Sequence, residues 1–271
     1  MNISSSQTNS SSGSSFNMWY FFPSFILVTP LGVPANALVL RALVGKAGIC
    51  STSEIFTTSQ AFMDLAFCVG LCIETIYNLI TKNRHVLKSL AFNQFGGPLH
   101  LTVKCLDSYL GVIYPITFMK LKAPEFRVSI CAVIWVSTLA YFIGTVVSPS
   151  LTSWGVMITQ LTVDLVIMYT CLIQVLWALN QAGPGRTEVH PVKRRAFKTV
   201  LSMFILINVH YCLPVVDYIY RQIAPSTTNE FRPLAMIAFT LQSMSSCVNP
   251  IFYLVRAKKC PLPFTCQGRQ G

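Results

Sequence analysis

Seven apolar runs, each long enough to cross a bilayer as a helix, follow one another along the chain. A helix rises 1.5 Å per residue, so about 20 apolar residues span a hydrocarbon core roughly 30 Å thick. Because lipid offers no hydrogen bonds to the backbone, only helices and closed barrels cross it. We therefore predict an all-α membrane protein folded as a seven-transmembrane helix bundle. The runs cover residues 19–40, 55–80, 86–114, 128–147, 154–179, 199–220 and 233–255.

The composition agrees with a chain that lies mostly in lipid. Of the 271 residues, 53% are hydrophobic and 11% are charged, whereas soluble domains carry roughly 25% charged residues. The third run is the least clear, since it contains Lys104 and Asp107. The net charge of +11 does not indicate nucleic acid, because in a membrane protein the position of the charges matters more than their sum. We expect a membrane domain over residues 19–255.

The distribution of basic residues predicts how the chain is oriented. Most of the 20 lysines and arginines fall on alternate connections, the ones that face the cytoplasm if the N-terminus is outside and the C-terminus inside. The serine-rich stretch 1–18 is then a disordered extracellular tail, and its sequons at Asn2 and Asn9 lie where glycans are added. Residues 256–271 form a short cytoplasmic tail. We predict a multi-pass protein of the plasma membrane.

A proline interrupts the last apolar run. Pro250 directly follows Asn249 and precedes Tyr253 by three residues. Proline inside a helix removes one backbone hydrogen bond, and in lipid the freed carbonyl needs another partner. We expect Asn249 to supply that donor, with Tyr253 on the same helix face. This stretch is a weak point in a membrane helix.

Several motifs occur in a fixed order along the runs. Asn249-Pro250-Ile251-Phe252-Tyr253 resembles the N-P-x-x-Y of rhodopsin-like G-protein-coupled receptors, and the segment around Asp64 resembles their L-A-x-x-D. The segment 106–115, LDSYLGVIYP, resembles the D-R-Y-L-A-V-x-x-P that ends the third helix of that family. Matches in six of the seven runs identify the chain as an atypical member. The other matching positions are Asn36, Trp135 and Pro214.

The resemblance implies a receptor that transduces an extracellular ligand into activation of a heterotrimeric G protein by rearranging its helices. Asp64 would form a buried polar cluster with Asn93, Ser245 and Asn249, holding either a structural sodium ion or plain hydrogen bonds; no other cofactor is expected. Cys260 and Cys266 would be palmitoylation sites. The activation motifs would comprise Asp107, Ser108, Tyr109, Pro214, Asn249, Pro250 and Tyr253.

The departures from the family motifs support an alternative function. Ser108 replaces the arginine of D-R-Y, and Tyr211-Cys212 replaces Cys-Trp before Pro214. The cysteines of the family's outer disulfide look missing. Such a protein would keep the receptor fold but couple weakly or not at all, as a decoy, a scavenger or a heteromer partner. Lys104 either pairs with Asp107 one turn later or extends to the inner interface.

A stripe on the sixth run predicts a ligand pocket. His210, Asp217 and Arg221 share a helix face, and Glu74 completes the candidate set; Asp217 and Arg221 could instead form a local ion pair. The basic outer segments hint at an anionic ligand. The histidines lack metal-ligand spacing, and no nucleophile–base set indicates an enzyme. A transporter with Asp64 as its ion site is a third hypothesis, but the two halves show no internal repeat.

Overall fold

A computed structural model describes residues 22–44, 54–81, 88–147, 154–180, 191–223 and 233–256. All regular structure in these ranges is helical. The elements are α1 (Phe22–Val44), α2 (Glu54–Thr81), the π-helix η2 (Phe92–Gly96), α3 (Gly97–Ile113), α4 (Pro115–Lys120), α5 (Pro124–Val147), α6 (Trp154–Asn180), α7 (Pro191–Ile223) and α8 (Pro233–Arg256).

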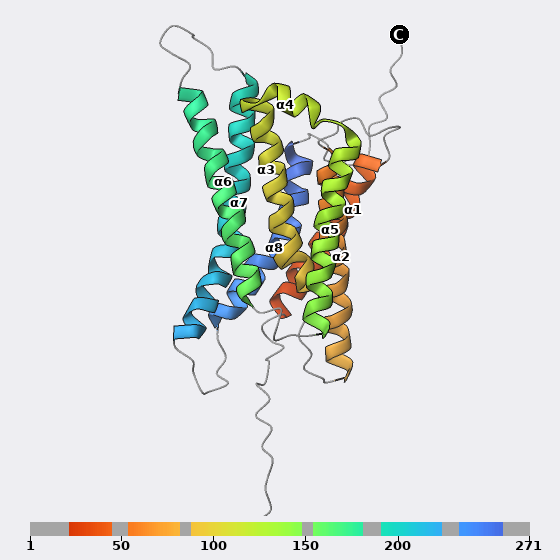
Figure 1. Ribbon diagram of the computed structural model, residues 1–271. Helices are drawn as coiled ribbons and strands as arrows, with labels where there is room; N and C mark the ends of the chain where they lie inside the picture. The colour runs from red at the N-terminus through yellow and green to blue at the C-terminus, as the bar shows by residue number, and fades with distance from the viewer. Residues whose placement is uncertain are drawn as a thin grey trace, which may run out of the picture.

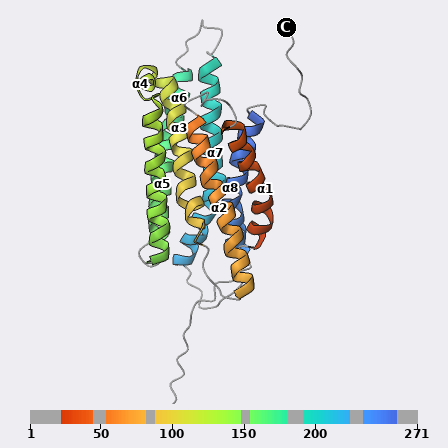
Figure 2. The same ribbon diagram turned by 90° about the vertical axis from the view of Figure 1, so that its right-hand side faces the viewer.

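The long helices lie side by side in one bundle, and consecutive ones alternate in direction (Figures 1 and 2). The short helix α4 follows α3 at one end, which we call the α4 end. α3 lies inside the bundle, where it packs against α2, α6 and α7. The chain's first and last long helices, α1 and α8, also pack against each other. The prediction of an all-helical membrane bundle is therefore confirmed.

Six described helices are long and apolar enough to cross a membrane: α1, α2, α5, α6, α7 and α8. α3, which lies within the third predicted run (86–114), the least clear of the seven, is not among them. Its 17 residues continue from η2, and its neighbours shield it, so it needs less hydrophobicity than a helix that faces lipid. The seventh span and the orientation of the termini stay predictions.

Apolar and polar side chains are distributed as a bilayer requires. Val133 and Val136 of α5 are 65% and 67% exposed, whereas Asn36 and Gln242 are fully buried. In water this arrangement would leave extended apolar surface in contact with solvent. In lipid it places apolar groups outward and polar groups inside the bundle, away from the hydrocarbon. The chain is a multi-pass membrane protein.

The π-helix η2 has a local cause. Gly97 N–H donates to the Phe92 carbonyl, and the next donor along the chain would be Pro98, which has no N–H. The Asn93 carbonyl therefore lacks a donor from its own helix, and the Tyr211 hydroxyl of α7 donates to it at 2.8 Å. A wider turn thus exposes a carbonyl that a neighbouring helix satisfies, as insertions of this kind often do at functional sites.

Candidate functional site

A buried polar cluster links α2, η2 and α8. The Ser246 hydroxyl donates to Asp64 Oδ1 at 2.9 Å. Asn93 Nδ2 contacts the hydroxyls of Ser245 at 2.8 Å and Ser246 at 2.9 Å. All four residues are buried. The structure thus brings together three of the four residues predicted for this cluster, and adds Ser246 as the bridge between Asp64 and Asn93.

The carbonyl freed by Pro250 is that of Ser246, four residues earlier. The sequence-based expectation that Asn249 supplies its donor is wrong. Asn36 Nδ2, from α1, donates to the Ser246 carbonyl at 2.9 Å and to the Gly32 carbonyl at 2.9 Å. The proline of α8 is therefore compensated by a side chain of another helix, and this contact joins α1 to α8.

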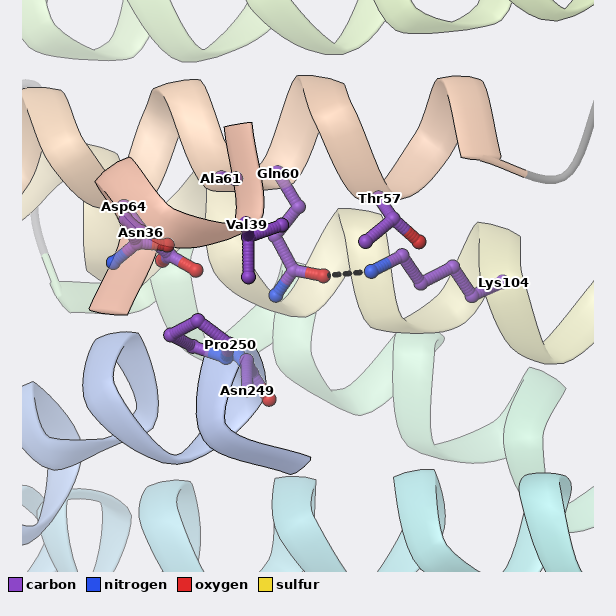
Figure 3. A pocket seen from close by; sticks show the side chains of 9 residues that line it. All are labelled: Asn36, Val39, Thr57, Gln60, Ala61, Asp64, Lys104, Asn249 and Pro250. Carbon is purple, nitrogen blue, oxygen red and sulfur yellow. Dashed lines mark hydrogen bonds between the residues drawn. The ribbon is translucent and has the colours of Figure 1, made fainter. Parts of the chain in front are cut away.

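A small cavity lies beside the cluster. Residues of α1, α2, α3 and α8 line it. Its volume is about 10 Å³, close to the minimum that holds one water molecule. Lys104 reaches into it from α3 and donates to Gln60 Oε1 (Figure 3). Of the two alternatives predicted for Lys104, the pairing with Asp107 is therefore wrong. The lining residues are Asn36, Val39, Thr57, Gln60, Ala61, Asp64, Lys104, Asn249 and Pro250.

Asp107 has a different cation. Arg127 of α5 forms an ion pair with Asp107 Oδ1, although Arg127 lies 20 positions further along the chain. Its guanidinium also lies over the rings of Phe56 and Phe118, at 5.4 and 5.5 Å from their centroids, a favourable cation–π arrangement. Arg127 is only 1% exposed. The serine at position 108, where the D-R-Y motif has an arginine, therefore does not leave Asp107 without a positive partner.

The other residues of the predicted activation motifs lie in three places. Ser108 is half-buried in α3. The Tyr109 hydroxyl donates to Gln174 Oε1 of α6, so it joins α3 to α6. Tyr253 packs on a cluster that includes Val39 and Leu254. Pro214 is buried within α7.

The residues predicted for a ligand pocket have structural contacts. His210 Nδ1 lies 2.6 Å from the Leu241 carbonyl of α8, and Asp217 is buried. Glu74 accepts hydrogen bonds from the Ser89 hydroxyl at 2.7 Å and from the backbone N–H of Lys88 at 3.1 Å, which fixes the chain as it enters the helical stretch before η2. The side chain of Arg221 lies outside the described part.

A third buried network joins α2, α3 and α5. His100, which is fully buried, contacts the Gly96 carbonyl through Nδ1 at 2.8 Å and the Ser59 hydroxyl through Nε2 at 3.0 Å. Trp135 Nε1 donates to the same hydroxyl at 3.1 Å. This gives Trp135 a polar partner inside the bundle. Sequence reasoning matched Trp135 to a family motif but did not find Ser59 as its partner.

Sequence reasoning also missed Gln60, Ser246 and Arg127. Ser246 had a signal, since it stands four residues before Pro250, where a proline frees a carbonyl. Gln60 stands one turn before Asp64, so the two share a face of α2. Arg127 had no such signal, because it lies 20 positions after Asp107 and nothing local in the sequence pairs the two residues.

Two sets of predicted modification sites cannot be placed. Asn2, Asn9, Cys260 and Cys266 all lie outside the described residues. Within the described ranges every cysteine is a free thiol, so no disulfide joins those helices.

The fold and its interior define a class: helical, multi-pass membrane proteins whose helices are joined by buried polar side chains. No protein-family model matches the chain. The chain is similar to proteinase-activated receptor 3 of Rattus norvegicus, at 27% identity over 275 residues, 86% of this chain and 72% of that protein. It is also similar to galanin receptor 2b of Danio rerio, at 26% identity over 281 residues, covering 86% and 71%.

A third relative, G-protein coupled receptor 183 of Homo sapiens, is 18% identical over 276 residues, 86% of this chain and 76% of its own length. The similarity thus extends over most of the chain and is low throughout. These relatives are receptors and not enzymes, which agrees with the prediction of a non-enzymatic protein.

Proposed function

We propose that this protein is a rhodopsin-like G-protein-coupled receptor of the plasma membrane, with η2 and α3 forming the seventh span. An extracellular ligand binds at the end of the bundle opposite α4 and favours a second arrangement of the helices. A ligand can shift this equilibrium only by its difference in affinity for the two arrangements. The rearrangement hinges near Pro214 and Pro250, where the helices lack a backbone hydrogen bond.

The hydrogen-bonded path from Asp64 through Ser246 to Asn93 is the observation that carries this proposal. It connects α2, η2 and α8 at the place where Pro250 weakens α8. A helix that is weakened there and held by side chains of other helices can exchange one set of polar partners for another. The similarity to named receptors over 86% of the chain supports the same function.

A second candidate function follows from Ser108. A serine offers one hydroxyl where the arginine of the family motif offers five donors in a rigid fork. Arg127 does not replace that arginine, because it is buried beside Asp107 between Phe56 and Phe118. The G-protein-facing end therefore lacks the family's cationic contact. In this alternative the protein keeps the receptor fold and couples weakly or not at all, as a decoy, a scavenger or a heteromer partner.

One experiment separates the two functions. Nucleotide exchange is measured on a panel of purified G proteins with the receptor in nanodiscs, for the unmodified protein and for Ser108→Arg. If Ser108 limits coupling, the substitution raises exchange at least several-fold, and Ser108→Ala, the matched control, leaves it unchanged. Robust exchange by the unmodified protein that Ser108→Arg does not alter removes the non-coupling alternative. No exchange by either protein on any G protein counts against the receptor function.

Further parts of the proposal concern the ligand and the modifications. The basic residues that precede η2, among them Lys88, favour an anionic ligand, and His210 and Asp217 lie on the α7 face toward α8 that would border it. Glycans at Asn2 and Asn9 would mark the outer side. Palmitoyl groups on Cys260 and Cys266 would anchor the segment after α8 to the inner leaflet. Mass spectrometry of protein purified from animal cells tests both modifications.

A further inference from the structure

An ammonium group of the protein itself lies in the cavity beside Asp64. Lys104 and Asp64 line the same cavity, with Gln60, Asn36 and Asn249 around them (Figure 3). Lys104 donates to Gln60 Oε1, and Gln60 stands one turn before Asp64 on the same face of α2. The two opposite charges therefore border one small cavity, in surroundings where little water screens their attraction.

The direction of the lysine has a physical reason. Side chains in a helix lean toward the helix N-terminus, and the N-terminal end of α3 continues into η2, where Asn93 joins the polar cluster. Lys104 therefore leans away from the α4 end and into the bundle. A lysine extending toward the nearer membrane surface would lean the opposite way. Gln60 then holds the ammonium in place.

The oxygens in this region would suit a small cation. Asp64 Oδ2 and Asn93 Oδ1 are both buried and have no hydrogen-bond partner, and carboxylate and amide oxygens are ligands that hard cations prefer. A sodium ion beside Asp64 would, however, share a cavity about the size of one water molecule with the ammonium of Lys104. Two positive charges cannot both be stable there opposite a single carboxylate.

We propose that Lys104 supplies the cation of this cavity, so that the unmodified protein does not bind sodium at Asp64 and removal of the lysine creates a sodium site. The lysine replaces an exchangeable ion with a tethered charge, and the polar core becomes insensitive to extracellular or intracellular sodium. This inference requires only the folded bundle and does not depend on ligand binding or on coupling to a G protein.

The test is the thermal unfolding of detergent-purified protein in NaCl against choline chloride at equal ionic strength. The Tm of the unmodified protein should be the same in both salts. The Tm of Lys104→Met should rise by on the order of a few degrees in NaCl, increasingly with concentration, because sodium binds only the folded state. Lys104→Met combined with Asp64→Asn should lose this sodium dependence.

Matched variants keep the result interpretable. Lys104→Arg retains a cation and should stay insensitive to sodium, while Lys198→Met removes an exposed lysine of α7 and should also show no sodium effect. Lys104→Gln, which keeps a donor for Gln60, replaces the methionine variant if that variant does not fold. A sodium-specific rise of Tm in the unmodified protein equal to that of the lysine variants overturns the proposal. So does the absence of any sodium effect in both Lys104→Met and Lys104→Gln.

Discussion

Arg127 supplies the positive charge that pairs with Asp107 in the segment Asp107-Ser108-Tyr109. A buried guanidinium needs compensation, and here it has Asp107 on one side and two aromatic rings on the others. Its Nε and Nη1 donors have no hydrogen-bond partner, so the rings and the single carboxylate carry the whole stabilisation. The pair connects α3 to α5 beside α4. Asp107 therefore stabilises the bundle even where the motif's arginine is missing.

Breaking this pair should destabilise the protein strongly. Arg127→Met leaves the Asp107 carboxylate without a cation, and removal of one partner of a buried pair costs about 3–5 kcal/mol. Replacement of both partners, by Arg127→Met with Asp107→Asn, should cost less than Arg127→Met alone. Thermal or chemical unfolding of Arg127→Met, Asp107→Asn and the double variant in detergent measures these differences.

Arg127→Lys is the control, because it retains the charge but loses the planar contact with the rings. It should be destabilised less than Arg127→Met. If the effects of the two single substitutions simply add in the double variant, the residues do not interact, and the ion pair contributes nothing to stability.

At the scale of single helices, two prolines each leave a backbone carbonyl without a donor in its own helix. A side chain of another helix donates to that carbonyl instead. Pro250 frees the Ser246 carbonyl, and Asn36 of α1 donates to it. Pro98 leaves the Asn93 carbonyl without a donor from its own helix, and Tyr211 of α7 donates to it. In lipid an unsatisfied carbonyl costs several kcal/mol, so these contacts fix which helices are neighbours. Prolines thus specify part of the packing of the bundle.

The α1–α8 contact can be measured with a double-mutant cycle. Asn36→Ala should destabilise the protein by about 1–3 kcal/mol, because it leaves the Ser246 carbonyl unsatisfied. In a Pro250→Ala background the backbone N–H of residue 250 can satisfy that carbonyl, so Asn36→Ala should cost clearly less. Unfolding of the four proteins in detergent gives the coupling. An equal cost of Asn36→Ala in both backgrounds would show that Pro250 is not the reason why the Ser246 carbonyl depends on Asn36 for a donor.

The sequence predicted helices well and contacts between helices poorly. The apolar runs place α1, α2, α5, α6 and α8 to within a few residues, because hydrophobicity is a local property. α7 begins at Pro191, eight residues before its apolar run at 199–220, because a helix can continue beyond its apolar part. The partner of Pro250's freed carbonyl was expected one residue away, at Asn249, and lies on α1. One of the two alternatives for Lys104 paired it with Asp107 one turn away, and the partner of Asp107 lies on α5. Local pairs were preferred because a sequence shows only local distances, whereas in lipid the strongest polar contacts form between helices.

The whole molecule has its polar groups in the interior and its apolar groups on the outside. Buried side chains such as Asp64, His100 and Gln242 lie among the helices, and valines and isoleucines cover the outer faces. Association of helices in lipid gains little from hydrophobicity, so close packing and hydrogen bonds between helices have to hold them together. Gly96 shows the closeness: an added Cβ atom would lie 2.0 Å from Met63 Sδ.

The orientation of this bundle in the membrane is a prediction that the positions of the charges make testable. Arg41 lies in the last turn of α1 and Lys120 in the last turn of α4, and Arg127 lies in the first part of α5. Because consecutive long helices alternate in direction, all three are at the α4 end (Figure 1), and the excess of basic residues marks the cytoplasmic side. An epitope tag placed before Met1 should therefore be stained on intact cells, and a tag placed after Gly271 should be stained only after permeabilisation. Staining of the C-terminal tag on intact cells, with the N-terminal tag hidden, would reverse the orientation and move the proposed ligand site to the cytoplasmic side.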